Sequence, residues 1–322
     1  MKKILITGGS GFIGSHLVKY YLKKNYKVAI TTKYNSIFEN IRLASVWKKI
    51  TIIESDLRNT DTLFKINDFS PEIVFHLAAY NDVGGSFSNQ TEALTSNLIS
   101  TSNLLENLRN YKQFIYISTS EIYGYQAKVP FREDMHPQPL SPYSIGKYAG
   151  ELYSQMHMKF YKKPIKIIRP FNAYGPGQSM KAVIPELIIK CLRGEKIRTT
   201  KGDQTREFNF VSDLVGGFAK CASTPKTIGG IYNIGSNYEI KIKDLVQLIH
   251  KLTNSKSQLG IGDLKKRKTD ISRMKSNYNK FNSVSGWKPE VKLINGLKAT
   301  IDWYRKYLEI IEKPNSGIQK IF

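Results

Sequence analysis

A tyrosine and a lysine four residues apart, Tyr143 and Lys147, are the clearest candidates for acid–base chemistry. Four residues make about one helical turn, so on a helix both side chains point the same way. A cation beside a phenol favours the phenolate and lowers a pKa that is otherwise near 10. The pair therefore predicts a general base that works near neutral pH, although a tyrosine and a lysine often share a helix face by chance.

Hydroxyl and carboxyl side chains follow an apolar run that predicts a strand over 114–118. The segment reads Ser118-Thr119-Ser120-Glu121. Ligands of open parallel sheets bind beyond the carboxyl ends of the strands. The polar side chains of Thr119, Ser120 and Glu121 are therefore expected to have a mechanistic use.

Three glycines follow the first apolar run, which begins at Ile4. Gly8 permits the turn after the strand, Gly11 permits close approach of a pyrophosphate, and Gly14 permits close packing of the next helix. The start of that helix offers free N–H groups and a positive dipole end. An ordinary glycine turn is the alternative, but the position between a strand and a helix favours dinucleotide binding.

The second predicted strand, 27–31, ends in Thr31-Thr32-Lys33 without a carboxylate. NAD is usually held there by an acidic residue on the ribose hydroxyls. A hydroxyl and a cation, with Arg42 as a second cation, suit a 2′-phosphate better. The sequence thus favours NADP over NAD, with solvated cations as the alternative.

Strands alternate with helices along the chain, which predicts an α/β protein with a Rossmann-type doubly wound parallel sheet. A smaller mixed α/β domain is expected to follow. Strands are also expected at 50–54, 72–77, 165–168 and 231–234, and helices at 91–108, 183–192, 244–252 and 296–311. Thr205 to Phe208 is expected to precede an alternating strand and Asp213.

The chain has 322 residues and a net charge of +23. Nucleic-acid binding would fit that charge, but the lysines are spread out and no recognition motif appears, so a solvated surface is favoured. No apolar run approaches the roughly 20 residues of a membrane span, and we expect a cytoplasmic protein without a targeting segment or membrane partner. The histidines and cysteines show no metal-ligand spacing, and Cys191 and Cys221 are expected to fill the core.

Taken together, these segments resemble the extended short-chain dehydrogenases that act on nucleotide-diphosphate sugars. The resemblance runs nearly end to end and in the family's order. Its motifs are TGGSGFIG, DLR at Asp56, HLAA at His76, STSEIYG at Ser118, the Tyr143/Lys147 pair, RPFNAYGP at Arg169, TREFNFVSD at Thr205, YNIGS at Tyr232 and GWKP at Gly286.

Within this family STSE is most similar to GDP-mannose 4,6-dehydratases, as is the loop that contains Lys33 and Arg42. Dehydratases of the dTDP-glucose type have Asp at the position of Ser120. The stretch RPFNAYGPGQSMKAVIP resembles dehydratases that act on an N-acetylglucosamine nucleotide. UDP-glucuronate decarboxylases share STSE, and 4-epimerases need no carboxylate at Glu121. The resemblance implies a 4,6-dehydratase, with a GDP-sugar favoured and epimerase or decarboxylase as alternatives.

The resemblance also implies site residues and a domain division. Residues 1–172 and 205–237 would form the NAD(P)-binding domain, and 173–204 and 238–322 the nucleotide-sugar domain. Substrate contacts are expected from Val83, Ser86, Thr119, Asn172, Val183, Lys190, Arg206 and Arg267. Cofactor contacts are expected from Gly8, Ser10, Gly11, Phe12, Ile13, Gly14, Thr32, Lys33, Arg42, Asp56, Leu57, Leu77, Ala78, Ala79, Asn97, Tyr143, Lys147 and Tyr174.

The implied reaction has three steps. Tyr143 takes the proton of the sugar's 4-hydroxyl as hydride leaves carbon 4, with Lys147 holding the phenolate and Thr119 the hydroxyl. Glu121 then removes the proton on carbon 5 and water leaves carbon 6, with Glu121 or a group held by Ser120 as the acid. Hydride returns to carbon 6, so the cofactor stays tightly bound and is regenerated each turnover. The resemblance further implies a homodimer whose subunits pair through the helices at 91 and 143.

Overall fold

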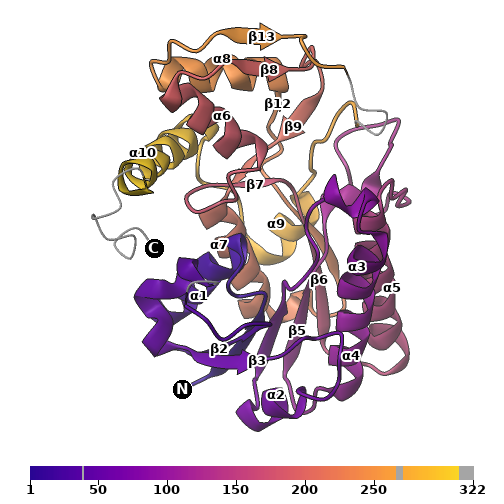
Figure 1. Cartoon of the computed structure of the whole chain (residues 1–322). Helices are drawn as coiled ribbons and strands as arrows, with labels where there is room; N and C mark the ends of the chain where they lie inside the picture. Colours follow the sequence, from indigo (N-terminus) through magenta and orange to yellow (C-terminus); the bar gives the residue numbers. More distant parts are fainter. Residues whose placement is uncertain (38–39, 266–270, 312–322) are drawn as a thin grey trace.

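Seven parallel strands form the main sheet of the protein (Figure 1). The computed structural model describes residues 1–37, 40–265 and 271–311. The strand order is β11-β6-β5-β4-β1-β2-β3. The strands are β1 (Lys3–Thr7), β2 (Lys27–Thr32), β3 (Thr51–Glu54), β4 (Ile73–His76), β5 (Gln113–Ile117), β6 (Ile165–Pro170) and β11 (Ile231–Ile234).

The strand order reverses between β1 and β4, which is the mark of a doubly wound sheet. The seven strands predicted from the sequence are all present, with ends shifted by at most two residues. The predicted fold class is confirmed. Because every pair is parallel, the turn after β1 and the polar segment after β5 lie at the same edge of the sheet.

Helices cover both faces of this sheet and form a second layer beyond its carboxyl edge (Figure 1). In the part of the chain that the structure describes they are α1 (Phe12–Lys23), α2 (Phe64–Phe69), α3 (Gln90–Leu94), α4 (Ser100–Asn107), α5 (Pro142–Phe160), α6 (Val183–Arg193), α7 (Val211–Ser223), α8 (Ile242–Leu252), α9 (Asn279–Ser285) and α10 (Leu293–Ile311).

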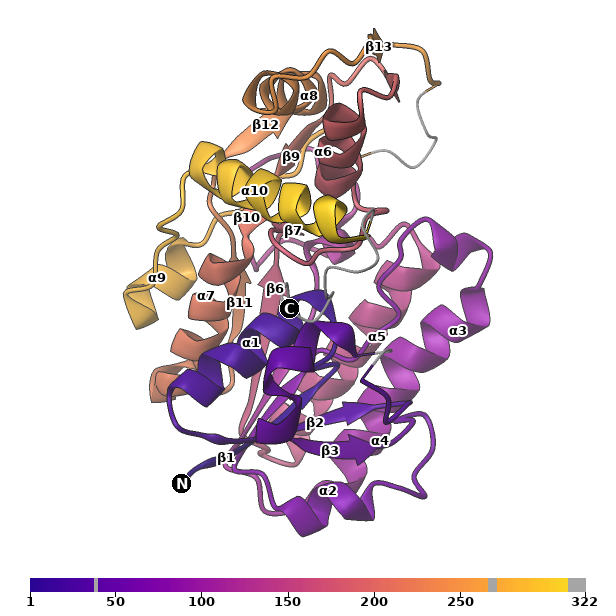
Figure 2. The same ribbon diagram turned by 60° about the vertical axis from the view of Figure 1, so that its left-hand side comes forward.

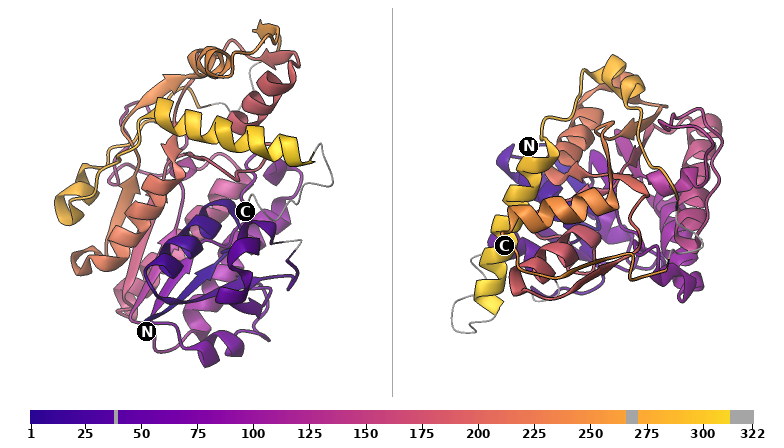
Figure 3. Two further views of the ribbon diagram at one scale, coloured as in Figure 1. Left: turned by 90° about the vertical axis from the view of Figure 1, so that its left-hand side faces the viewer. Right: turned by 90° about the horizontal axis from the view of Figure 1, so that it is seen from above.

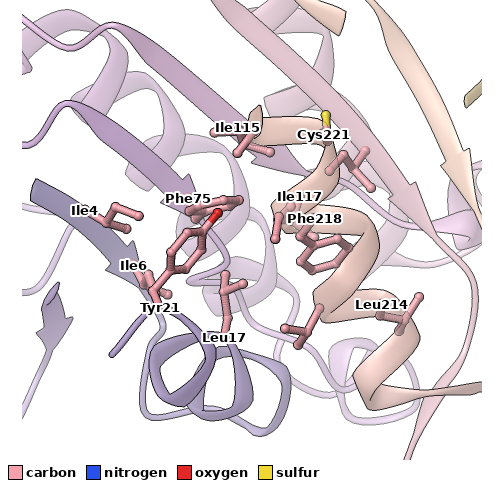
Figure 4. Packing of buried hydrophobic residues seen from close by; sticks show 14 of the residues in the cluster. Ile4, Ile6, Leu17, Tyr21, Phe75, Ile115, Ile117, Leu214, Phe218 and Cys221 are labelled. Carbon is pink, nitrogen blue, oxygen red and sulfur yellow. The ribbon is translucent and has the colours of Figure 1, made fainter. Parts of the chain in front are cut away.

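Alternation along the strands divides the core between the two faces. Ile4 and Ile6 of β1 pack with α1 and α7, together with Phe218 (Figure 4). Leu5, between them, packs on the opposite face with Leu104 of α4. Successive side chains of a strand point to opposite faces, so an all-apolar strand is buried on both sides.

A separate apolar cluster joins α6, α8 and α10. Figure 2 shows α10 passing beside α6, and Figure 3 shows α8 at the opposite end of the molecule from the N-terminus. Among its described residues this half has three two-stranded sheets: β7 (Ala173–Tyr174) with β10 (Asn209–Phe210), β9 (Thr205–Glu207) with β12 (Glu239–Lys241), and β8 (Ile197–Thr199) with β13 (Leu259–Ile261).

Residues 205–213 fold differently from the sequence-based expectation. Thr205–Glu207 is itself a strand. The strand expected before Asp213 is the two-residue β10, and because the chain turns into α7 at Val211, Asp213 lies in that helix. The division into two domains stays a prediction. Within it, β11 joins the main sheet whereas β9 pairs with β12 outside it.

The helix predicted over 91–108 is not a regular α-helix. It is α3, then a π-helical turn at Thr95–Ile99, then α4. The side chain of Asn97, in that turn, bonds to the backbone of Tyr80 and to the carbonyl of Tyr143. Such turns are frequent beside functional sites, and periodicity alone does not reveal them.

None of the helices within the described ranges is long and apolar enough to cross a membrane. Within the same ranges no group of three His, Cys, Asp or Glu side chains is arranged to hold a metal ion. Cys191 and Cys221 are both buried and free, in the two apolar clusters where core packing was expected.

Close packing of α5 on the neighbouring helical segment predicts opposite effects for two helical glycines. A Cβ at Gly150 would lie 2.6 Å from the hydroxyl of Tyr116 and 2.8 Å from the carbonyl oxygen of Asn97. Gly150→Ala should therefore destabilise the fold by about 2 kcal/mol through overpacking. At Gly216 of α7 the nearest atom is 3.9 Å away, so Gly216→Ala should stabilise by about 0.5–1 kcal/mol through helix propensity. Urea unfolding of both variants checks the pair, and equal effects would contradict it.

Candidate active site

A cavity of about 620 Å³ opens at the carboxyl edge of the main sheet. Its wall combines the turn after β1, the segment 117–121 after β5, the start of α5, and residues between 170 and 208. The volume lies in the usual range for small-molecule sites. The predicted site residues that line it are Gly8, Gly11, Phe12, Ile13, Gly14, Leu77, Ala79, Val83, Thr119, Ser120, Glu121, Tyr143, Lys147, Asn172, Val183 and Arg206.

The other predicted site residues do not line this cavity. They are Ser10, Thr32, Lys33, Arg42, Asp56, Leu57, Ala78, Ser86, Asn97, Tyr174 and Lys190. Arg267 lies outside the described residues.

Three of these residues have other partners in the structure. Tyr174 is buried in the cluster of α6, α8 and α10, and its hydroxyl donates to the carbonyl of Leu293 at 3.1 Å. Lys190 pairs with Glu186 one turn earlier on α6, at 2.6 Å. The buried hydroxyl of Ser86 donates to the carbonyl of Val83 at 2.7 Å. All three side chains therefore make contacts within the fold.

The start of α5 fixes where Tyr143 stands. Ser141 caps the helix by accepting a hydrogen bond from the backbone N–H of Ser144 at 3.1 Å, and the Ser144 hydroxyl accepts from the Ser141 backbone at 3.0 Å. Pro142 occupies the first turn, where its missing N–H costs nothing. This reciprocal cap begins the helix one residue before the tyrosine and so directs the phenol toward the end of β5.

The pKa of Tyr143 differs from the sequence-based expectation. Burial raises it to about 12, a hydrogen bond with Thr119 lowers it, and the charge of Glu121 raises it. The expectation that Lys147 lowers this pKa below its ordinary value is wrong for this structure, because removal of the phenol from water has the larger effect.

Lys147 is almost fully buried, with 3% of its surface exposed. Its Nζ donates to the carbonyl of Ile117 at 2.5 Å and lies 4.5 Å from the centre of the Tyr116 ring. Burial lowers the pKa of the ammonium to about 7, against the opposing charge of Glu151. This side chain can thus gain or lose a proton near pH 7, and nearby charges affect which form is present.

The polar segment after β5 has a partner that the sequence gives no sign of, Met274. The hydroxyl of Ser120 donates to its sulfur at 3.5 Å, and so does the side-chain amide of Asn172. Met274 is fully buried. A thioether is a weak acceptor, so it orients both polar groups at the cavity wall without adding charge there.

The glycine turn fits a dinucleotide. A Cβ at Gly8 would lie 2.7 Å from the backbone nitrogen of Ala78, and one at Gly14 would lie 2.2 Å from the carbonyl oxygen of Gly8. Gly11 caps α1 without a side-chain hydrogen bond, and the first turn carries no acidic residue. The first N–H groups of α1 therefore have no side-chain cap to compete with a phosphate.

Beyond the end of β2 the charges are already paired. Nζ of Lys33 lies 3.8 Å from Asp56 and 3.5 Å from Glu92, and Arg58 bonds to both of these carboxylates. Arg42 donates to the carbonyl of Gly177 at 2.7 Å, across to the other half of the chain. A 2′-phosphate at this end would have to compete for Lys33 with two carboxylates.

Several cavity residues were not predicted from the sequence. Several of them lie beside predicted residues within the motifs that begin at Ser118, Arg169 and Thr205, whereas Asn81, Thr200, Gln204 and Ile242 lie in segments without a recognisable pattern. They are Asn81, Ile117, Ser118, Pro170, Phe171, Ala173, Gln178, Ala182, Thr200, Gln204, Phe208 and Ile242. The neighbouring predicted residues Asn172, Val183 and Arg206 were the signal that could have found some of them.

A doubly wound sheet, a glycine turn built for a dinucleotide and a tyrosine, lysine and threonine on one cavity wall define a dinucleotide-dependent enzyme. The family model described as "NAD dependent epimerase/dehydratase family" matches residues 4–235. The chain belongs to this family, as the sequence resemblance predicted.

Proteins with related sequences have several activities. The human dTDP-D-glucose 4,6-dehydratase is 33% identical over 95% of this chain and 90% of its own length. UDP-glucuronic acid decarboxylase 1 of Xenopus tropicalis is 30% identical over 96% of this chain and 73% of its own length. The crystal structure of a UDP-glucuronic acid 4-epimerase from Bacillus cereus, in complex with UDP-glucuronic acid and NAD, has a TM-score of 0.87 and 30% identity over 95% of this chain and 99% of that chain.

The buried ammonium predicts that Lys147 costs stability at neutral pH. Its folded-state pKa of about 7 lies below the ordinary value of 10.5, so the folded protein binds fewer protons between these values and stability rises with pH across them. Lys147→Met should therefore raise the free energy of unfolding by about 2 kcal/mol below pH 7, and the gain should shrink toward pH 10. Thermal unfolding over this range measures it, and a loss of stability below pH 7 would refute the argument.

Proposed function

We propose that this protein is a nucleotide-sugar 4,6-dehydratase, which converts a nucleotide-diphosphate hexose to the 4-keto-6-deoxy sugar. The observation that carries the proposal is the position of Glu121. This carboxylate lines the same cavity as Thr119, Tyr143 and Lys147, close enough to Tyr143 for its charge to raise the pKa of the phenol. A second acid–base group beside the first allows elimination to follow oxidation.

The first step in this proposal is oxidation at carbon 4. The bound nicotinamide dinucleotide would supply the hydride acceptor and later return the hydride. Tyr143, in its phenolate form, takes the proton of the 4-hydroxyl, and Thr119, already hydrogen-bonded to Tyr143, holds that hydroxyl in line. Because burial disfavours the phenolate, the ammonium of Lys147 has to be charged when the proton moves.

The second step is loss of water across carbons 5 and 6. The ketone at carbon 4 acidifies the proton on carbon 5, and the carboxylate of Glu121 removes it. The backbone N–H of Glu121 donates to Oγ1 of Thr119 at 3.2 Å, which ties the base to the residue that holds the 4-hydroxyl. The proton of the Ser120 hydroxyl is directed to Met274, so Glu121 is the preferred donor to the leaving hydroxyl.

The proposal also names NADP as the cofactor and a GDP-sugar as the substrate. NADP is favoured because β2 ends without a carboxylate and with Lys33, which a 2′-phosphate would take from Asp56 and Glu92. The GDP-sugar is favoured by the likeness of STSE to GDP-mannose dehydratases. Two other outcomes have support: the human relative is named for dTDP-glucose, and the Bacillus cereus structure holds NAD.

A 4-epimerase or a decarboxylase would use the same first step. An epimerase has no use for Glu121, and a decarboxylase needs a uronic acid. Incubation with GDP-, UDP-, dTDP- and CDP-sugars, each with NADP or NAD, separates the three by product mass. Loss of one water supports the proposal, and unchanged mass or loss of carbon dioxide contradicts it.

Replacement of Glu121 should separate the two chemical steps. Glu121→Gln keeps Thr119, Tyr143 and Lys147 and should still oxidise the sugar, so reduced nicotinamide should accumulate while dehydration falls by about 10²-fold or more. Absorbance of the reduced cofactor and product mass measure the two steps. Glu186→Gln, in an exposed pair on α6, is the control. Dehydration by Glu121→Gln at the normal rate would overturn the assignment.

We also propose that two copies pair through the helical segment 90–107 and α5. These helices lie side by side on the outer face of the sheet (Figure 1). Large apolar side chains stay exposed along them: Leu94, Ile99, Ile145 and Leu152, each between 39% and 47% exposed. Ile145 and Leu152 are seven residues apart and share one face of α5, as an intersubunit helix bundle requires.

Charges on this face should prevent pairing. Ile145→Asp combined with Leu152→Asp should convert a dimer to a monomer in light scattering after size-exclusion chromatography, because each carboxylate would be buried without a partner. Ile228→Asp is a matched control, since Ile228 is 48% exposed but precedes β11. A wild-type monomer, or a double variant that stays dimeric, would contradict the proposed interface.

A further inference from the structure

Two side chains of helix α5, one turn apart, make hydrogen bonds with the end of β5. Nζ of Lys147 donates to the carbonyl of Ile117 at 2.5 Å. One turn later, Oε2 of Glu151 accepts a hydrogen bond from the hydroxyl of Ser118, also at 2.5 Å. Glu151 has no exposed surface. Successive residues of the strand end are thus fixed by successive turns of the helix.

A buried arginine completes this contact. Nη2 of Arg169, on β6, lies 2.6 Å from Oε1 of Glu151, and its Nε donates to Oε2 at 3.2 Å. Arg169 is 3% exposed and also donates to the hydroxyl of Tyr123 at 2.8 Å. Two opposite charges can remain buried when they pair and hydrogen-bond with each other in this way. Burial of either charge alone would be strongly unfavourable.

We propose that Glu151 and Arg169 are positioning residues: their ion pair holds the strand end that carries Thr119 and balances the charge beside Lys147. The proposal rests on the proposed oxidation step, which needs Thr119 in place and the ammonium charged. Neither residue lines the cavity, so both act through their neighbours.

The charge around Lys147 explains why the pair matters. The charge of Glu151 raises the pKa of Lys147, against burial, which lowers it to about 7. Burial lowers the pKa of the neighbouring His76 to about 3, so that histidine is neutral near pH 7. The titratable or charged groups that interact with Lys147, or with Glu151 one turn later, are His76 of β4, Tyr116 of β5, Tyr148 and Glu151 of α5, and Arg169 of β6, and the phenol of Tyr143 interacts with Tyr116.

Two single variants should act in opposite directions. Glu151→Gln keeps an acceptor for Ser118 but removes the negative charge, so Lys147 should lose its proton at a pH lower by about one unit. Arg169→Met leaves Glu151 unbalanced, so Lys147 should keep its proton to a higher pH. The variant with both changes removes a neutral pair and should lie near wild type. A buried pair replaced as a whole is usually tolerated, which keeps the test open if a single variant does not fold.

The first measurement needs no substrate. Thermal unfolding from pH 5 to 9 should show the rise in stability starting at lower pH in Glu151→Gln and at higher pH in Arg169→Met, relative to wild type. The same substitutions in a Lys147→Met background should have no such opposite effects, which removes contributions from other groups. Unchanged pH dependence in the folded variants, or equal shifts in both backgrounds, would overturn the proposal.

The second measurement follows the reaction. The alkaline limb of the pH profile for sugar oxidation should move down by about one unit in Glu151→Gln, up in Arg169→Met, and little in the double variant. Glu186→Gln, which removes an exposed carboxylate from α6, is the control. If wild type oxidises no nucleotide sugar, the proposed function fails while the unfolding data still decide the role of the pair. A loss of rate at every pH, with the alkaline limb of the profile unmoved, contradicts the proposed role of the pair.

Discussion

The site depends on keeping the ammonium of Lys147 almost without water. Its Nζ has a carbonyl and an aromatic face as neighbours, and burial lowers its pKa to about 7. An ordinary lysine would stay charged across the physiological range. This one sits where small changes in nearby charge decide whether it is charged. The acid–base character of the cavity therefore depends on groups such as Glu151 that do not line it.

The sheet makes this burial possible. Each strand is apolar on both faces, and α1 and α7 cover one face while α4 and α5 cover the other. The carboxyl edge carries the polar groups of the cavity, and there the parallel arrangement brings the turn after β1 beside the end of β5. Close contacts such as Gly150 against the carbonyl of Asn97 bring α5 near enough to reach that edge.

The opposite wall of the cavity comes from residues far along the chain. Asn172 follows β6, Arg206 lies in β9, and Met274 reaches both Ser120 and Asn172 from a segment near the C-terminus. Arg206 donates to the carbonyl of Ile271 at 2.6 Å, so the same segment holds two parts of this wall. The proposed catalytic groups thus lie at the end of the sheet, whereas the proposed substrate contacts Asn172 and Arg206 come from segments that follow it.

Local patterns in the sequence determined the strands, the glycine turn and the pairing of Tyr143 with Lys147 on one helix face. These follow from periodicity, turn chemistry and the helical repeat, which act over a few residues. The π-helical turn and the partners of Lys33 and Arg42 did not follow, since distant groups such as Tyr80, Glu92 and Gly177 impose them. Tertiary structure also decided the pKa of Tyr143. A neighbouring cation can be read from spacing, but the loss of water around a phenol depends on how the whole chain packs.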